Sequence, residues 1–220
     1  MKKDIVLYGA GGLARETHWM ITSDSKLRDQ FNIKGFIVDE KYLDSTPKSV
    51  YGTPVYAKNF LINANRGRPI GVIICIGDTY GRKHVYENLS KFENISFPSL
   101  IYPTCRISPD AVIGEGAMIH SNCTITVNAK IGKCVFMNGN VTVGHDAVIE
   151  DFVSIYPRCD ISGHVKIGGC TSIGTQSFIL ERKNVGENSV VVPGSIVLRN
   201  VPSNVTVMGN PAKVYMKHTI

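Results

Sequence analysis

Residues 143–161 read VGHDAVIEDFVSIYPRCDI, and within them Val143, Ile149, Ile155 and Ile161 recur at every sixth position. The same period continues in both directions along the C-terminal half of the chain. A second class of mostly smaller residues stands four positions after each aliphatic one, with Lys183 as the exception. Sixteen successive positions hold an aliphatic residue or methionine: Ile107, Ile113, Ile119, Ile125, Ile131, Met137, Val143, Ile149, Ile155, Ile161, Ile167, Ile173, Ile179, Val185, Val191 and Val197.

A strict period of six fits neither a helix, with its period of 3.6, nor a strand, with its period of two. A triangular solenoid does explain it, because six residues make one flat side and eighteen make one coil. Stacked coils pair their short strands in parallel and bury a continuous column of aliphatic side chains. The sixteen repeats predict about five coils, whereas a β-sandwich would need alternating polarity and hairpin turns.

The N-terminal half has a different pattern, typical of an α/β domain. Apolar strands are predicted at residues 5–8, 36–38 and 72–76, with helices at 13–22 and 82–89. Strands that alternate with helices favour a parallel, Rossmann-like sheet. We therefore expect two domains, covering residues 1–100 and 101–220.

Composition narrows the classes of function. No apolar run is long enough to cross a membrane, and the first apolar strand is too short for a signal peptide, so we expect a cytoplasmic protein. The net charge of +6 comes without a run of Lys or Arg, which favours an anionic small substrate over nucleic acid. The six cysteines include no CxxC pair, so no metal site is expected.

The repeat, together with residues 208–214 (MGNPAKV), resembles the hexapeptide-repeat acyltransferase superfamily. Residues 9–12 (GAGG), 35–40 (GFIVDE) and 76–78 (IGD), and Asn138 with residues 143–146 (VGHD), are similar to the NeuD/PglD-type nucleotide-sugar acetyltransferases. The resemblance implies a left-handed parallel β-helix for the C-terminal domain and a homotrimer. It also implies that the first domain binds a nucleotide-linked amino sugar and the second binds acetyl-CoA.

His145 is the leading candidate for catalysis, because a neutral imidazole can accept a proton from an attacking amine or hydroxyl. Asp146 could hold the other ring nitrogen and fix the tautomer. Gly163 lies one coil, or eighteen residues, after His145, so its N–H could stabilise an oxyanion. The resemblance adds Asn138 near the sugar. His164, one coil after Asp146, could be a second site group or a surface residue, and we favour the surface.

The resemblance also implies binding residues. For the nucleotide sugar these are Gly9, Gly11, Gly12, Leu13, Asp39, Glu40, Gly77, Asp78 and Arg82; for acetyl-CoA they are Ser154, Gly163, Gly174, Thr175, Pro193, Gly194, Gly209, Asn210, Pro211 and Lys213. Two of these depart from the family pattern, since Leu13 and Ser154 stand where many relatives have histidine. The glycine loop also fits the dinucleotide pattern G-x-G-x-x-A, with NAD or a purely structural loop as its alternatives.

The resulting hypothesis is an acetyl-CoA-dependent N-acetyltransferase of a nucleotide-linked 4-amino-4,6-dideoxy sugar in surface glycan biosynthesis. An O-acetyltransferase of sialic acid or of another sugar hydroxyl is the alternative within the same fold. A trimeric scaffold without activity is the alternative from another class, and the His145–Asp146 pair disfavours it.

Overall fold

The computed structural model describes residues 2–63 and 69–218. Its contacts divide the chain into two compact units, Met1–Gly77 with His84–Pro98, and Asp78–Lys83 with Ser99–Ile220. The second unit therefore includes a short segment, residues 78–83, that the sequence placed in the first domain. Within the described residues, no helix combines the length and apolarity that a bilayer-spanning segment requires.

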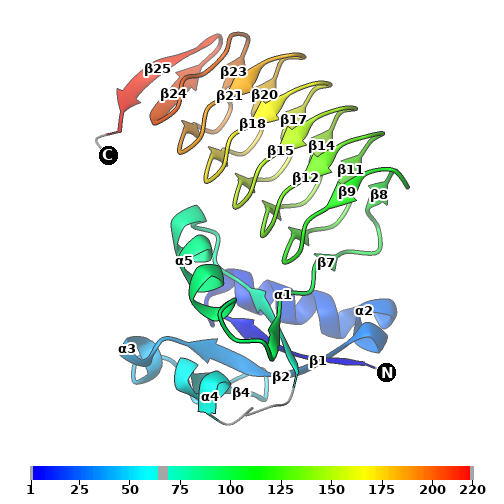
Figure 1. Cartoon of the computed structure of the whole chain (residues 1–220), viewed down its shortest axis with the longest axis vertical. Coiled ribbons are helices and arrows are strands. Elements are labelled where there is room, and N and C mark those ends of the chain that lie inside the picture. Colours follow the sequence, from blue (N-terminus) through cyan, green and yellow to red (C-terminus); the bar gives the residue numbers. More distant parts are fainter. Residues whose placement is uncertain (1, 64–68, 219–220) are drawn as a thin grey trace. The chain divides into compact units, whose positions relative to one another are not determined.

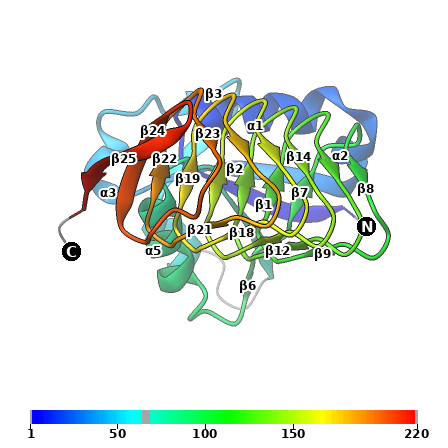
Figure 2. The same cartoon turned by 90° about the horizontal axis from the view of Figure 1, so that it is seen from above.

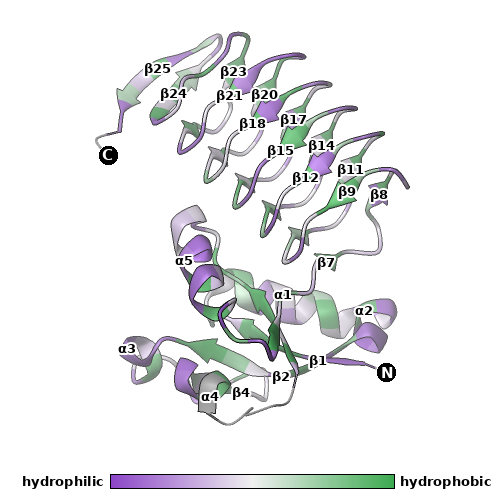
Figure 3. Ribbon diagram, viewed as in Figure 1, coloured by the Kyte–Doolittle hydropathy of each residue, from purple (hydrophilic) through white to green (hydrophobic). Residues whose placement is uncertain are grey.

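The first unit is built on a six-stranded sheet in the order β3-β4-β2-β1-β5-β6, in which only the β3–β4 pair is antiparallel. The central strand β1 is buried over residues 5–8 because parallel neighbours lie on both of its sides. Figure 3 shows the corresponding hydrophobic stretch of β2 in green. The strands are β1 Lys3–Tyr8, β2 Phe31–Val38, β3 Ser49–Val50, β4 Thr53–Ala57, β5 Ile70–Ile74 and β6 Ile95–Ser96.

Five helices accompany these strands: α1 Gly12–Ser23, α2 Ser25–Gln30, α3 Glu40–Leu43, α4 Lys58–Asn63 and α5 Thr79–Leu89. Between β1 and α1 the backbone turns at Gly9, where φ is +117°. A Cβ at this position would lie 3.0 Å from the carbonyl oxygen of Cys75, so glycine also permits this close approach.

The second unit is a left-handed parallel β-helix, which confirms the architecture predicted from the six-residue period. Its strands form three ladders, and Figures 1 and 2 show the coils stacked upon one another. The first ladder holds β7 Leu100–Ile101, β10 Met118–Ile119, β13 Phe136–Met137, β16 Ser154–Ile155, β19 Ser172–Ile173, β22 Val190–Val191, β24 Val205–Gly209 and the antiparallel β25 Ala212–Lys217.

The second ladder holds β8 Arg106–Ile107, β11 Thr124–Ile125, β14 Thr142–Val143, β17 Asp160–Ile161, β20 Phe178–Ile179 and β23 Ile196–Val197. The third holds β9 Val112–Ile113, β12 Lys130–Ile131, β15 Val148–Ile149, β18 Lys166–Ile167 and β21 Asn184–Val185. Three turns, which we call corners, join these ladders. The first corner leads from the first ladder to the second, the second corner from the second ladder to the third, and the third corner from the third ladder back to the first.

The second residue of nearly every short strand points into the prism and is buried, so the aliphatic column forms the core. At the corners a residue with positive φ recurs at every sixth position from Asn122 to Asn188, with φ between 49° and 61°. Asparagine and aspartate tolerate this left-handed conformation. Phe152, Arg158 and Arg182 also adopt it, so ladder pairing outweighs the local preference of these residues.

Candidate active site

The second corner brings four of the singled-out residues together. His145 lies two residues after β14 and Gly163 two residues after β17, and these strands pair in parallel with Thr142 opposite Asp160. Asp146 and His164 follow directly, both in the left-handed conformation, with φ of 58° and 56°. The eighteen-residue coil therefore stacks Gly163 on His145, and His164 on Asp146.

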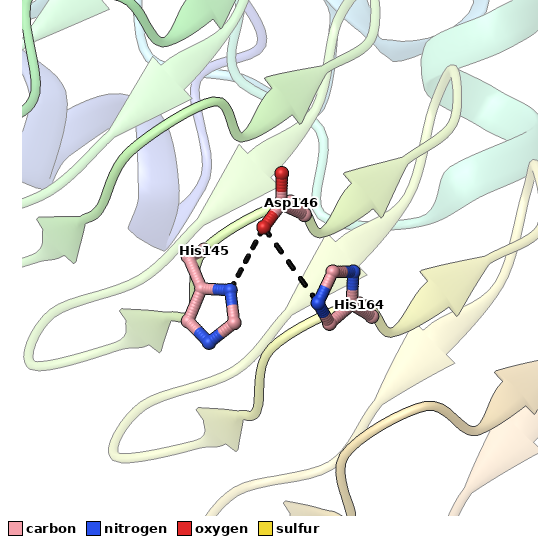
Figure 4. Close-up of side chains that lie close together, drawn as sticks. All are labelled: His145, Asp146 and His164. Carbon is pink, nitrogen blue, oxygen red and sulfur yellow. Dashed lines mark hydrogen bonds and ion pairs between the residues drawn. The ribbon is translucent and has the colours of Figure 1, made fainter.

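His145 and Asp146 form a hydrogen-bonded pair (Figure 4). Nδ1 of His145 lies 2.8 Å from Oδ2 of Asp146. Oδ1 of Asp146 accepts a second hydrogen bond, of 2.6 Å, from Nδ2 of Asn128 one coil earlier. These hydrogen bonds, led by that from His145, hold the pKa of the Asp146 carboxyl below its usual range. An ionised Asp146 therefore favours the proton on Nδ1 of His145 and leaves the lone pair on Nε2.

Gly163 lies against Nε2 of His145, the atom that would accept a proton. A Cβ at Gly163 would stand 2.6 Å from Nε2 and 2.7 Å from Cε1 of that ring. Only glycine leaves this flank of the imidazole clear. Among the hydrogen bonds of the described residues, none uses the N–H of Gly163 as donor, and the residue itself is buried.

His164 belongs to the same cluster, which favours the alternative of a second group at this site over a residue of the surface alone. Its Nε2 lies 3.7 Å from Oδ2 of Asp146, and its ring meets the His145 ring edge-on with centroids 5.0 Å apart. The side chain is 38% exposed. Sequence spacing could have found both His164 and Asn128, since each lies eighteen residues from Asp146.

His145, Asp146 and His164 also offer ligand atoms within 4.8 Å of one another, a donor set that a divalent cation could use. In this geometry, however, the closest of those atoms, Nδ1 of His145 and Oδ2 of Asp146, already bond each other.

Asn138 lies apart from this cluster, at the first corner between β13 and β14. Its Oδ1 accepts a 2.7 Å hydrogen bond from the N–H of Gly139. It neighbours the buried His120, whose pKa burial lowers to about 4 while the Asn138 side chain opposes the shift. Among the described residues of one chain, Asn138 makes no hydrogen bond to His145.

The residues predicted to bind acetyl-CoA lie along the first ladder and its corner. Gly174 and Thr175 follow β19, and Pro193 and Gly194 follow β22. Gly209 closes the β24–β25 hairpin opposite Ala212, with Asn210, Pro211 and Lys213 beside it. His145 stands at a different corner, with the second ladder in between. Of the described residues predicted to bind acetyl-CoA, one chain therefore brings Gly163 to the base and leaves those of the first ladder and its corner apart from it.

The first unit holds a cavity of about 500 Å³ beside the glycine loop, lined by Gly9, Gly11, Asp39, Tyr42 and Cys75 among others. Helix α1 begins at Gly12 after Gly11, which provides no side-chain cap, so the first N–H groups of the helix can receive an anion. Leu13 belongs to the first turn of α1, where its carbonyl accepts a bond from the Thr17 hydroxyl. Gly77 lies in the loop between β5 and α5.

Asp39 faces this cavity and is held by its neighbours. Its Oδ1 accepts a 2.7 Å hydrogen bond from the Tyr8 hydroxyl and lies 3.5 Å from Nζ of Lys58. Burial and this bond to a carboxylate raise the pKa of the Tyr8 hydroxyl far above its usual range. Glu40 accepts a bond from the Asn59 N–H, and Asp78 accepts one from the Gly81 N–H, so both support local structure.

Arg82 and Ser154 require corrections. Arg82 is only 2% exposed and donates to the carbonyl oxygens of Cys134, Phe152 and Val153 at the third corner. It also donates to Oγ of the fully buried Ser154. Burial lowers the pKa of Arg82 to about 10, which leaves it a cation at neutral pH. Both side chains therefore stabilise the coil and are inaccessible to a ligand in solution.

Comparisons with known proteins add to this geometry. A family model described as the PglD N-terminal domain matches residues 4–89. The acetyltransferase domain of PglB from Neisseria gonorrhoeae, in complex with acetyl coenzyme A, is similar over 97% of this chain and 100% of its own, with 26% identity and a TM-score of 0.84. A mutant of perosamine N-acetyltransferase from Caulobacter crescentus, in complex with CoA and GDP-perosamine, has a TM-score of 0.85 at 22% identity over 96% of both chains, a likeness of fold.

Matches to curated proteins are short and fall on acetyltransferases. The 2,3,4,5-tetrahydropyridine-2,6-dicarboxylate N-acetyltransferase of Clostridium perfringens is 48% identical over 42 residues, which are 19% of this chain and 18% of the relative. The chain thus matches about a fifth of the length of such curated relatives. The chain thus carries a PglD N-terminal domain followed by a left-handed β-helix, and nearly its whole length is similar in structure to a solved acetyltransferase domain.

Proposed function

We propose that the protein transfers the acetyl group of acetyl-CoA to the amine of a nucleotide-linked 4-amino-4,6-dideoxy sugar. The observation that carries this proposal is the second corner, where Asp146 holds Nδ1 of His145 and Gly163 leaves Nε2 accessible. This arrangement suits the removal of a proton from an attacking amine. We further propose that the reaction takes place in the cytoplasm and serves surface glycan biosynthesis.

The chemistry follows from these groups. The lone pair of the sugar amine attacks the thioester carbonyl carbon, a C–N bond forms, and the carbonyl electrons move to oxygen. Nε2 of His145 takes the proton that the amine loses. The N–H of Gly163 donates to the resulting oxyanion. The carbonyl then reforms, the C–S bond breaks, and His145 returns its proton to the thiolate of coenzyme A.

The nucleotide sugar is assigned to the cavity of the first unit. Its phosphates suit the uncapped start of α1, and Asp39 could accept a bond from a ribose hydroxyl. The acetyl-CoA is assigned to the second unit. Relatives support the choice of these two ligands, because the Caulobacter protein was crystallised with CoA and GDP-perosamine and the Neisseria domain with acetyl coenzyme A.

A homotrimer with sites between subunits would complete the active site. Apart from Gly163, the predicted acetyl-CoA residues and His145 occupy different places on one prism, so a neighbour would have to supply the missing wall. A convex corner also cannot enclose the large share of a ligand that good sites bury. Light scattering should report a mass near three times the 24.1 kDa chain, and a fully active monomer would contradict the shared site.

O-acetylation of a sugar hydroxyl remains the second candidate, because His145 could activate a hydroxyl with the same geometry. A scaffold without activity is disfavoured by the intact dyad. A thiol-release assay with acetyl-CoA and a panel of nucleotide-linked amino and hydroxy sugars separates these functions. Release that depends on an amino sugar supports the proposal, release with hydroxy sugars favours O-acetylation, and no release with any acceptor contradicts both.

A further inference from the structure

His164 shares an oxygen atom with the proposed base pair, although the mechanism above does not use it. Its Nε2 lies 3.7 Å from Oδ2 of Asp146, the same oxygen that lies 2.8 Å from Nδ1 of His145. The other oxygen of Asp146 is occupied by Nδ2 of Asn128. Asn128 bonds the carboxylate from the coil below and His145 from its own coil, while Nε2 of His164 lies 3.7 Å away on the coil above. Figure 4 shows the two histidines beside Asp146.

The backbone fixes His164 in this place. Its N–H donates a 2.8 Å hydrogen bond to the carbonyl oxygen of His145, which ties the two histidines across adjacent coils. Its ring then stands at 88° to the His145 ring. The next residue in the same corner column is Arg182, whose Nε lies 3.2 Å from Oε1 of Glu181. The charged or titratable groups around His164 are thus His145 and Asp146 below it, and Glu181 and Arg182 above.

The orientation of Asp146 matters for the tautomer of His145. A free neutral imidazole prefers its proton on Nε2, and in that tautomer Nε2 cannot accept a proton from a substrate. Asp146 reverses that preference only while Oδ2 stays in line with Nδ1 of His145. Asp146 is partly exposed, with a third of its side chain open to water, so its carboxylate can rotate away. Nε2 of His164, 3.7 Å from Oδ2, stands just outside hydrogen-bond distance, and a small turn of either side chain would let its N–H bond the same oxygen and oppose this rotation.

We propose that His164 is a positioning residue that holds Oδ2 of Asp146, and thereby keeps His145 in the tautomer with its proton on Nδ1. This inference rests on the proposed function for its catalytic consequence, but the tautomer itself is a property of the free protein. His164 acts through Asp146 and does not touch the reacting atoms.

Two substitutions distinguish the effect of the N–H donor of His164 from the effect of its ring. His164→Gln keeps an N–H donor at about the reach of Nε2 and removes the ring, whereas His164→Phe keeps a ring and removes the donor. The chain already accepts both residue types in the same left-handed corner position, at Gln176 and Phe152, with φ of 58° and 60°. Both variants should therefore fold. Arg158→Gln, at the same position of another corner, is the matched control.

The first measurement is ¹⁵N NMR of the histidine side chains at pH 8, on the protein without substrates. We expect the Nδ1–H form of His145 in the wild type, in His164→Gln and in Arg158→Gln, and a mixture of tautomers in His164→Phe. An unchanged His145 tautomer in His164→Phe overturns the proposal. This result does not depend on acetyl transfer, so it stays informative even if the proposed function fails.

The second measurement is the kinetics of thiol release. In His164→Phe, kcat should fall about 10-fold, a part of the roughly 100-fold that a general base contributes, with both KM values nearly unchanged. His164→Gln should recover most of that loss. A rise in KM alone would mean that His164 contacts a substrate, and equal losses in both variants would assign its effect to the ring; either result overturns the proposal.

Discussion

Replacement of Gly163 by alanine tests how closely the coil positions the base. The added Cβ would lie 2.6 Å from Nε2, 2.7 Å from Cε1 and 3.1 Å from Cδ2 of His145, whereas ordinary contact begins near 3.4 Å. The imidazole must therefore withdraw by most of an ångström. Half of the His145 side chain is exposed, so it can do this without disturbing the core.

The expected result is a loss of turnover without a loss of stability. Misplacement of a reacting group by about 1 Å can cost roughly 100-fold in rate, so we expect kcat to fall between about 10- and 100-fold. Alanine keeps the N–H of Gly163, so the oxyanion donor stays. The φ of Gly163 lies outside the left-handed region, so the backbone accepts alanine.

The assay is thiol release at saturating substrates, together with thermal unfolding. Gly169→Ala is the matched control, because Gly169 occupies the same place at the third corner and its Cβ would meet only Asp151 O at 3.3 Å and Glu150 Oε2 at 3.9 Å. The control should keep its kcat. Wild-type turnover in Gly163→Ala, or a midpoint of unfolding far below that of Gly169→Ala, would refute the reasoning.

Three further predictions concern the other parts of the molecule. Arg82→Met should lower the free energy of unfolding by about 2–4 kcal/mol, because it leaves buried carbonyl groups without a hydrogen-bond donor. Denaturant titrations measure this change, with the exposed Arg15→Met as the control, and a loss below about 0.5 kcal/mol would contradict the prediction. His120 has its pKa lowered to about 4 by burial, so protonation of the unfolded state should cost the wild type up to about 3 kcal/mol as pH falls from 6.5 to 4. His120→Phe should not show that loss of stability. If the free energies of unfolding of the two proteins change in parallel with pH, protonation of His120 is not the cause. Asp39→Asn should raise KM for the nucleotide sugar and spare KM for acetyl-CoA, and equal changes in both would argue against separate binding domains.

Periodicity predicted most of the second unit because its fold repeats one backbone geometry. Once six residues make one side, an interval of eighteen fixes which residues stack, so Gly163 could be placed beside His145 without coordinates. The same interval pointed to His164 and could have pointed to Asn128, but spacing does not say which side chains turn toward Asp146. That orientation depends on the left-handed corners and on the hydrogen bonds that they permit.

The errors arose where contacts are distant in sequence. The Arg82 side chain bonds to residues 52 to 72 positions away, and no local pattern distinguishes it from a ligand-binding arginine. Ser154 is covered by that arginine and could not be recognised as buried for the same reason. The strand β4 was also missed. Its sequence, TPVYA, contains Pro54, which argues against a strand, and it lacks a clear alternation of polar and apolar residues.

The central claim is that Nε2 of His145 accepts the proton of the attacking amine. The measurement that tests it most directly is kcat of His145→Ala at saturating acetyl-CoA and nucleotide amino sugar, with the exposed His84→Ala as the matched control. We predict a fall of at least about 100-fold for His145→Ala, unchanged thermal unfolding, and normal turnover for the control. Near-normal turnover in His145→Ala would contradict the account.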